Sequence, residues 1–316
     1  IGNPPYSGHS ANDSEWSAKL LRGGVEPAAN YFKVDGKPLG ERNPKWLNDD
    51  YVKFMRYAQW RLQMSGTGVW SYITNHGYLD NPTFRGMRQS LMNTFRNTQL
   101  IDLHGNSKKK ETCPDGSPDI NVFDIQQGVA IAVFARLPGI GEAQVRHGHL
   151  YGLREAKYAR LSRETAGNMA ETALEPQPPF YLFCPEDRGL WNEYGQWPPL
   201  NHALPVNSVG IVTARDALTI HWDTQEAWKV VQDFVGLPEE EARHKYNLSK
   251  DARDWKVSLA QADLRASGPS REYLAPVLYR PFDTRAAYYT GRTRGFICMP
   301  RPEVMRHMLG GGNVGL

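Results

Sequence analysis

The first residues of the sequence could hold a planar ring that carries an amine. Residues 3–6 read Asn3-Pro4-Pro5-Tyr6. Proline fixes its own φ angle and forces the preceding residue toward extended backbone, so this segment is stiff and its carbonyl groups cannot pair within a helix. The Asn3 amide oxygen and the Pro4 carbonyl oxygen can accept the two N–H groups of an exocyclic amine. Tyr6 adds an aromatic face for stacking.

Such acceptors would help to alkylate the amine of a nucleobase. The nitrogen lone pair is delocalised into the ring, and two hydrogen bonds from the amine return electron density to the nitrogen. A base must leave its duplex to reach such a site, at a cost of a few kcal/mol, and stacking on an aromatic ring returns about 1–3 kcal/mol. The alternative interpretation is that residues 3–6 form an ordinary loop or a polyproline-type ligand.

Helices and strands alternate after this segment. Apolar residues at helical spacing predict helices over 44–63 and 82–95. Strands are predicted at 66–75 and 98–106, with one or two more within 120–137. This alternation is typical of a parallel sheet with crossover helices.

The remaining chain has a more mixed pattern. Residues 7–44 are predicted to be a long loop, and residues 175–201 form a loop rich in proline and tryptophan. Further helices are predicted at 153–164, 223–235 and 238–265.

The overall composition is that of an ordinary globular protein. The chain has 316 residues and a formal net charge of only +3, so an anionic partner must be bound by local basic patches. Its three cysteines form no C-x-x-C pair, which indicates a reducing cytosol. The longest apolar run is shorter than the roughly 18 residues that span a bilayer. We therefore expect a cytoplasmic protein without membrane attachment.

The motifs resemble the methyltransferases that methylate the amino group of adenine in DNA. Asn3-Pro4-Pro5-Tyr6 matches the [DNS]-P-P-[YFW] signature of that family. The segments "GVWSYITNHGYL" and "RGMRQSLMNTFRNTQLIDLHG" match later parts of the same catalytic domain. The segment from "LYRPFDTRAAYYTG" onward is similar to the start of the specificity domain in single-chain restriction-modification enzymes of the type ISP group.

This resemblance implies a fold and a function. The fold would be α/β: the C-terminal half of a Rossmann-like methyltransferase sheet at 1–150, a mixed α+β helical connector at 151–270, and the start of a DNA-specificity domain at 271–316. The activity would be transfer of a methyl group from S-adenosylmethionine to adenine in double-stranded DNA. Asn3 and Pro4 would bind the adenine amine, Pro5 would stiffen the turn, and Tyr6 would stack on the flipped base.

The cofactor motif of that family is missing from the sequence. Its glycine-rich F-x-G-x-G segment would precede the N-P-P-Y motif, whereas this sequence begins two residues before the motif. Residues 310–315 fit G-x-G-x-x-G, but no strand precedes them and no helix follows, so we interpret them as a loop. No cofactor-binding residue is predicted. We expect a fragment of a longer chain, which could also carry nuclease and motor domains, and we expect the isolated fragment to be inactive.

Two groups of basic residues could contact DNA. One recurs at three-residue spacing in the predicted helix 153–164 and is interpreted as a stripe facing phosphates: Arg154, Lys157, Arg160 and Arg163. The alternative is a solvated helix face. After residue 271, arginines without any lysine alternate with aromatic residues, and Arg292 and Arg294 are predicted to contact nucleic acid. The nearby Tyr279 and Phe282 are expected in a core.

Other chemistries lack their motifs. The sequence has no phosphate-binding G-x-x-x-x-G-K-[ST] segment and no H-E-x-x-H motif. His147 and His149 are two residues apart without neighbouring ligands, so no metal site is predicted. His76 is expected to make a local hydrogen bond in a loop. Two other functions stay open: a non-catalytic DNA-specificity fragment, and a methyltransferase that acts on RNA or on a protein glutamine.

Overall fold

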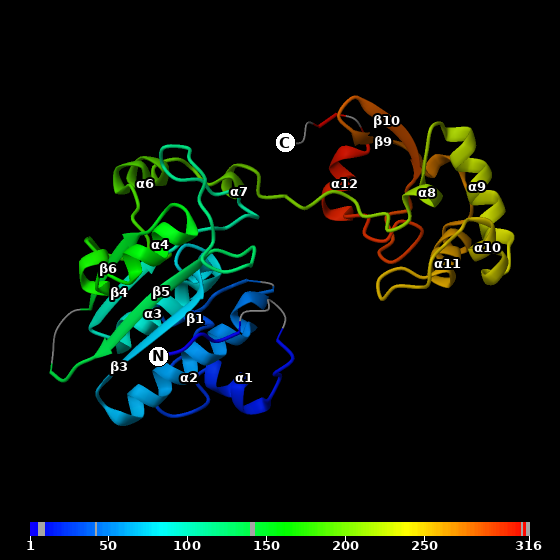
Figure 1. Cartoon of the computed structure of the whole chain (residues 1–316). Coiled ribbons are helices and arrows are strands. Elements are labelled where there is room, and N and C mark those ends of the chain that lie inside the picture. Colours follow the sequence, from blue (N-terminus) through cyan, green and yellow to red (C-terminus); the bar gives the residue numbers. More distant parts are fainter. Residues whose placement is uncertain (6–9, 42, 140–142, 311, 314–316) are drawn as a thin grey trace. The chain divides into compact units, whose positions relative to one another are not determined.

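The chain divides into two compact units, Ile1–Leu190 and Trp191–Leu316, each with a hydrophobic core of its own (Figure 1). The residues described by this computed structural model are 1–5, 10–41, 43–139, 143–310 and 312–313. Within these ranges, no helix has the length and apolar character needed to cross a bilayer.

The first unit contains a mixed sheet with helices on both faces (Figure 1). Its strands are β1 (Lys33–Val34), β2 (Lys37–Pro38), β3 (Gly68–Asn75), β4 (Asn97–Asp102), β5 (Val129–Arg136), β6 (Gln144–His149) and β7 (Thr172–Leu174). Its α-helices are α1 (Glu15–Leu21), α2 (Asp50–Ser65), α3 (Arg85–Thr94), α4 (Arg154–Leu161) and α5 (Ala166–Met169), and α6 (Arg188–Gly195) crosses into the second unit. Its 3-10 turns are η1 (Lys45–Asn48), η2 (His76–Tyr78) and η3 (Pro82–Phe84).

The main sheet has the strand order β3-β5-β4-β6-β7. Strand β5 runs antiparallel to both β3 and β4, whereas β4 and β6 are parallel. The predicted α/β class is therefore confirmed, but the predicted parallel sheet is wrong. The reason is the connection from β4 to β5: residues 103–128 contain no helix, and β5 returns beside β4 in the opposite direction.

Both faces of this sheet are buried. Leu100 and Ile101 are neighbours on β4 and point to opposite faces, as successive strand residues must. Leu100 belongs to the core formed with α2 and α3, where Met55 and Leu91 are fully buried. Ile101 belongs to a separate core that includes Met169 of α5. The apolar character of β4 on both faces follows from this double cover.

Residues 7–44 contain more structure than the predicted loop. Ser14 caps α1 by accepting a hydrogen bond from the Ser17 N–H at 3.2 Å. Strands β1 and β2 form a hairpin whose two-residue turn is Asp35-Gly36, both with positive φ, as such turns require. These elements are too short to show a period in the sequence.

A buried ion pair attaches α4 to the segment that follows β4. The Lys157 ammonium lies 2.7 Å from Asp119 Oδ1, and both side chains are 0% exposed. The ammonium also donates to the carbonyl oxygens of Leu103 and Ile120. Asp119 in turn accepts the backbone N–H groups of Gly105 and Gly152. This charge pair is therefore fully hydrogen-bonded on both sides.

The second unit packs helices on a small antiparallel sheet with strand order β8-β10-β9. Its strands are β8 (Ile220–His221), β9 (Leu274–Arg280) and β10 (Asp283–Tyr288). Its helices are α7 (Leu200–Ala203), α8 (Asp216–Thr219), α9 (Thr224–Gly236), α10 (Glu239–Lys245), α11 (Val257–Ser267) and α12 (Pro302–Met308), with the 3-10 turn η4 (Arg271–Tyr273). The single helix predicted at 238–265 is two helices, because the chain turns at Asn247, which has a positive φ.

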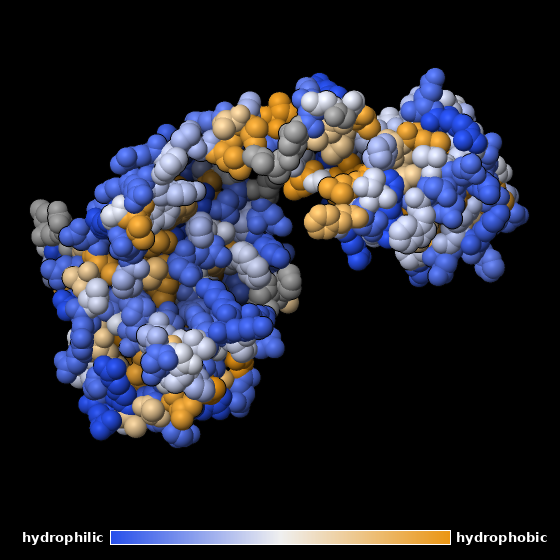
Figure 2. Space-filling model, turned by 90° about the horizontal axis from the view of Figure 1, so that it is seen from above, coloured by the Kyte–Doolittle hydropathy of each residue, from blue (hydrophilic) through white to orange (hydrophobic). Residues whose placement is uncertain are grey.

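The segment from residue 190 to 212 contributes little to either core. It carries exposed apolar side chains on a surface that is otherwise largely hydrophilic (Figure 2). They include Leu190, Tyr194, Trp197, Leu200, Val206 and Val209. The proline- and tryptophan-rich loop predicted at 175–201 also includes α6 and part of α7.

The buried ion pair predicts a large loss of stability when only one partner is removed. Replacement Lys157→Met leaves the Asp119 carboxylate buried without a counter-charge, which costs about 3–5 kcal/mol. The matched control Arg163→Ala removes one positive charge from an exposed side chain and should change stability by less than about 0.5 kcal/mol. Urea unfolding followed by circular dichroism measures both values. Similar losses in the two variants would contradict this account.

Candidate functional site

The N-P-P segment lies at the carboxyl end of β3. The Gly2 N–H donates to the Ser71 carbonyl at 3.0 Å, and the Ile73 N–H donates to the Gly2 carbonyl at 3.1 Å. These bonds form a parallel bridge between Gly2 and Tyr72. A Cβ atom on Gly2 would lie 2.7 Å from the Tyr72 ring, so the close approach requires glycine.

The prolines anchor this segment and leave the asparagine accessible. Pro4 is buried, whereas Asn3 and Pro5 are exposed. Because the Gly2 bridge is parallel to β3, residues 3–5 run toward the carboxyl end of that strand. His76 is the first residue after this end. Tyr6, the predicted stacking residue, lies outside the described residues. The structure thus presents the Asn3 amide at this edge of the sheet.

A group of imidazoles and carboxylates lies at the same edge. Strands β3, β4 and β6 all run in one direction, so their carboxyl ends meet there. His76 follows β3, Asp102 ends β4, and His149 ends β6. In the parallel register, Asp102 is paired with His149. We call these three residues, together with His104 and Glu111, the edge cluster.

Hydrogen bonds connect the edge cluster. His76 Nδ1 lies 2.9 Å from Asp102 Oδ1, which also accepts the His104 N–H at 3.0 Å. His104 Nε2 lies 2.8 Å from His149 Nδ1. The other ring nitrogen of His104, Nδ1, lies 3.8 Å from Glu111 Oε1. The His104 ring stacks on Tyr151 with a centroid distance of 3.8 Å. The hydrogen bond of His76 is therefore long-range, and the predicted local bond is wrong.

These contacts shift the protonation of the cluster. Burial opposes the charge of Asp102, but its hydrogen bond with His76 and the nearby imidazoles lower its pKa below the usual value. Burial likewise disfavours protonated His76, yet the hydrogen bond and charge of Asp102 raise the pKa of His76. Asp102 is therefore ionised at neutral pH. His76 holds its proton to a higher pH than a free histidine does.

The predicted basic stripe on α4 is wrong for Lys157, whose ammonium is buried against Asp119. The spacing also does not make one face. Arg154 and Arg163 are nine residues apart, which is two and a half helical turns, and α4 ends at Leu161. A three-residue repeat therefore drifts around the helix instead of following one side.

The three arginines of that set differ in their partners. Arg154 is half-buried, lies 2.7 Å from Asp124 and donates to the Asn121 carbonyl. Arg160 pairs with Glu164 at 3.0 Å. Arg163 is exposed and, in the part of the chain that the structure describes, has no acidic partner. Of the predicted stripe, Arg163 is thus the side chain most available to an anionic ligand.

Arg292 and Arg294 lie on an exposed loop that a buried carboxylate supports. Asp263 accepts hydrogen bonds from the Thr290 hydroxyl and from the Phe296 N–H, at 2.7 and 2.8 Å. Arg292 is exposed, and Arg294 is 57% exposed with a 3.5 Å contact to Asp254. The structure therefore places both predicted residues at the surface of the second unit.

Of the two aromatic residues expected in a core, Phe282 lies outside any core and Tyr279 is only partly buried. Phe282 is 105% exposed at the turn between β9 and β10 and has a positive φ. Tyr279 is half-buried, and its hydroxyl lies 2.9 Å from Asp216. The core prediction is therefore wrong for Phe282, because an alternating strand pattern does not tell where the turn falls.

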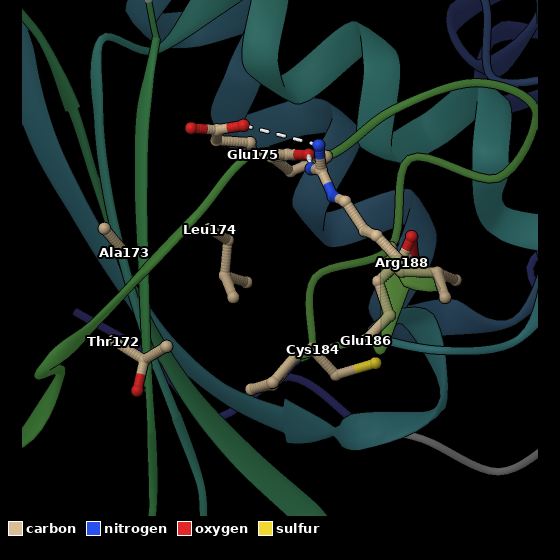
Figure 3. A pocket seen from close by; sticks show the side chains of 10 residues that line it. Thr172, Ala173, Leu174, Glu175, Cys184, Glu186 and Arg188 are labelled. Atoms are coloured by element: carbon tan, nitrogen blue, oxygen red, sulfur yellow. Dashed lines mark hydrogen bonds and ion pairs between the residues drawn. The ribbon is translucent and has the colours of Figure 1, made fainter. Parts of the chain in front are cut away.

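A pocket of about 270 Å³ lies beside β7 (Figure 3). In Figure 3, Arg188 points toward Glu175, and its Nη1 lies 3.3 Å from the Glu175 carboxylate. Burial raises the pKa of the neighbouring Cys184 to about 11. Its sulfur is thus a thiol at neutral pH, which is the less reactive form.

The sequence pattern does not predict the edge cluster as a group. It also predicts no metal site at His147 and His149, because no ligand stands near them in the chain. Their neighbour is Asp102, on a strand that the parallel register places beside them. No strand is predicted at 144–149, so the available signal is limited to the polar "DLHG" within the strand predicted at 98–106 and to the two histidines of "HGH".

Solved structures share this fold at low sequence identity. A nuclease-deletion mutant of the type ISP restriction-modification enzyme LlaGI, in complex with a DNA substrate mimic, has a TM-score of 0.57 and 22% identity over 93% of this chain. The DrdV–DNA complex has a TM-score of 0.56 and 20% identity over 93% of this chain. The ATP-dependent type ISP enzyme LlaBIII bound to DNA has a TM-score of 0.54 and 19% identity over 92% of this chain.

This chain spans only part of those proteins, covering 29%, 31% and 20% of their respective lengths. No curated protein matches the sequence. Residues 202–316 match the family described as the type ISP C-terminal specificity domain, a range that includes both 271–316 and much of the connector that we predicted at 151–270. Residues 202–316 therefore form a type ISP C-terminal specificity domain, which confirms the resemblance to the type ISP restriction-modification group.

Proposed function

We propose that this chain is part of an enzyme that methylates the exocyclic amine of adenine in double-stranded DNA. The observation that carries the proposal is the N-P-P segment at the carboxyl end of β3, with Asn3 exposed and Pro4 buried. Ligands of open α/β sheets bind outside the carboxyl ends of the strands, which is the edge where Asn3 lies.

In this proposal the described residues bind and orient the base. The Asn3 amide oxygen and the Pro4 carbonyl oxygen accept the two N–H groups of the adenine amine. The buried Pro4 ring keeps these acceptors fixed before the base arrives, so little free energy is lost in ordering them. Tyr6 is proposed to stack on the base after it leaves the duplex.

We further infer that the sheet is the C-terminal half of a Rossmann-like methyltransferase sheet. Gly2 adds a parallel neighbour to the outer side of β3, and the helices cover both faces. The limited coverage of the solved relatives supports a longer protein. The division at residues 150 and 270 stays part of this proposal.

S-adenosylmethionine is the methyl donor that the family resemblance implies. In the described ranges of the first unit, no glycine-rich turn joins a strand to a helix in the way that would hold this cofactor. The glycine run at 310–315 lies partly outside the described residues. We therefore assign no residue of this chain to the methyl donor.

The second unit is proposed to bind the DNA duplex. It contains the specificity domain, and the solved relatives LlaGI, DrdV and LlaBIII were captured with DNA or a DNA mimic. Arg292 and Arg294 offer exposed guanidinium groups for phosphate or base contacts. A specificity domain of this family favours DNA over RNA or a protein glutamine as the substrate.

The amine-binding role predicts the effect of removing one acceptor. In the full-length protein that carries this chain, Asn3→Ala should lower the rate of methyl transfer at least about 100-fold, as loss of one aligned hydrogen-bonding group does in other active sites. Affinity for duplex DNA should not change. The control Asn93→Ala replaces an exposed asparagine of α3 and should keep full activity.

Incorporation of labelled methyl groups into adenine-containing duplex DNA measures this rate, and a mobility-shift titration measures affinity. A fully active Asn3→Ala enzyme would refute the amine-binding role. A wild-type enzyme that labels RNA or protein but not DNA would refute the substrate assignment.

The phosphate role of Arg292 predicts a weaker salt dependence of DNA binding. Loss of one phosphate contact lowers the slope of log K against log salt concentration by about 0.9. Arg292→Ala should show this change. Arg253→Ala, which removes an exposed guanidinium already paired with Asp254, should not. Binding is measured by fluorescence anisotropy between about 50 and 200 mM salt, and equal slopes in the two variants would exclude the contact.

A further inference from the structure

Two neighbouring parallel strands place three metal-binding side chains together. Strand β4 pairs with β6 so that Leu100 is beside His147 and Asp102 is beside His149. His147 and His149 are two residues apart on one strand and therefore point to the same face. One ligand atom from each of Asp102, His147 and His149 lies within 4.8 Å of the other two. Small side-chain rotations would bring such atoms to the bond lengths of one ion, about 2.0–2.2 Å.

His147 lacks the partners that a buried imidazole needs. It is 0% exposed, and neither ring nitrogen has a hydrogen-bond partner among the described residues. Leaving a buried polar group unpaired costs about 1–3 kcal/mol, so such groups are rare and need an explanation. An imidazole whose two nitrogens both lack a partner in this way has a lone pair free to bind a metal ion.

Asp102 is held in place with one oxygen available. Its Oδ1 accepts hydrogen bonds from His76 Nδ1 and from the His104 N–H. Its Oδ2 lies 3.6 Å from His104 Nδ1, which is too long for a hydrogen bond. Carboxylates that bind metals are commonly fixed by hydrogen bonds of this kind on the other oxygen.

His149 is oriented by a hydrogen bond with His104 and is exposed to solvent. Its Nδ1 lies 2.8 Å from His104 Nε2, and His104 lies 3.8 Å from Glu111 on its other side. A metal-binding histidine usually has such a partner on its second nitrogen. His149 is exposed, whereas Asp102 and His147 are buried, so an ion has a route from solvent.

We propose that Asp102, His147 and His149 bind one divalent transition metal ion of the zinc type. Two imidazoles and one carboxylate suit Zn²⁺ and its neighbours, whereas Mg²⁺ and Ca²⁺ prefer oxygen ligands alone. The ion would join the carboxyl ends of β4 and β6 and give His147 the partner that it lacks.

A second set, His76, His104 and Glu111, also brings its ligand atoms within 4.8 Å of one another. His76 Nδ1 and His104 Nε2 are already engaged with Asp102 and His149. These residues therefore orient the ligands, and the ion is assigned to the set that contains the unpartnered His147.

Metal titration of the full-length protein tests this site without measuring methyl transfer. After removal of metals with a chelator, calorimetry with Zn²⁺ should show one ion per chain at this site. Co²⁺ should give the visible absorption of a low-symmetry nitrogen and oxygen site. His149→Ala should weaken Zn²⁺ binding at least about tenfold, because it removes one ligand. His76→Ala should weaken it by about 10–100-fold through loss of the orienting bond.

The matched control is His202→Ala, which removes an exposed histidine of the second unit and should bind Zn²⁺ as the unchanged protein does. Because His149 is exposed, its replacement should leave the fold intact, which thermal unfolding in the presence of chelator verifies. The proposal is overturned if the unchanged protein binds no Zn²⁺, or if His149→Ala and His202→Ala bind it equally well. Since no methyl donor or DNA is present, failure here leaves the proposed methylation untouched.

Discussion

The antiparallel pairing of β5 with both β3 and β4 determines where the chemistry of the first unit lies. Because β5 runs against both neighbours, β3 and β4 point in the same direction, and β6 follows β4 in parallel. The ends of three strands therefore meet at one edge. If β5 ran parallel to only one of β3 and β4, the N-P-P segment beside β3 would lie at the opposite end of the sheet from Asp102 and His149.

The buried ion pair of Lys157 and Asp119 holds the loop that follows β4 at this edge. Lys157 on α4 binds Asp119 and the carbonyl of Leu103, and Asp119 accepts the N–H of Gly105. His104 lies between the two backbone groups held in this way. A Cβ atom on Gly105 would lie 2.4 Å from the backbone of Asn121, so the loop is also closely packed. The ion pair thus fixes the position of an imidazole that it does not touch.

The second unit uses the same principle for a different purpose. Asp263 is buried on α11 and accepts hydrogen bonds from the loop that carries the exposed arginines. Gly295 leaves room for this carboxylate, since a Cβ atom there would lie 2.2 Å from Asp263 Oδ2. In the first unit a buried ion pair positions a buried loop, and in the second unit a buried carboxylate positions a loop that carries exposed arginines. Flexible surface residues can then bind a partner with less loss of conformational entropy.

The sequence by itself determined the properties that depend on residues close together in the chain. The stiffness of Asn3-Pro4-Pro5, the amphipathic helices α2, α3 and α9, and the α/β class all follow from local backbone chemistry and side-chain period. The family motifs near the C-terminus are likewise recognised from residues close together in the chain.

Only the tertiary structure decided strand direction, register and charge pairing. In the sequence Lys157 has the spacing of a surface residue, whereas in the fold Asp119 lies beside it. His147 and His149 have no ligand near them in the chain, whereas in the fold β4 places Asp102 in register with His149. Local sequence shows which face of a strand is apolar. Which strand lies next to it depends on contacts between residues far apart in the chain, such as the 45 residues that separate His104 from His149.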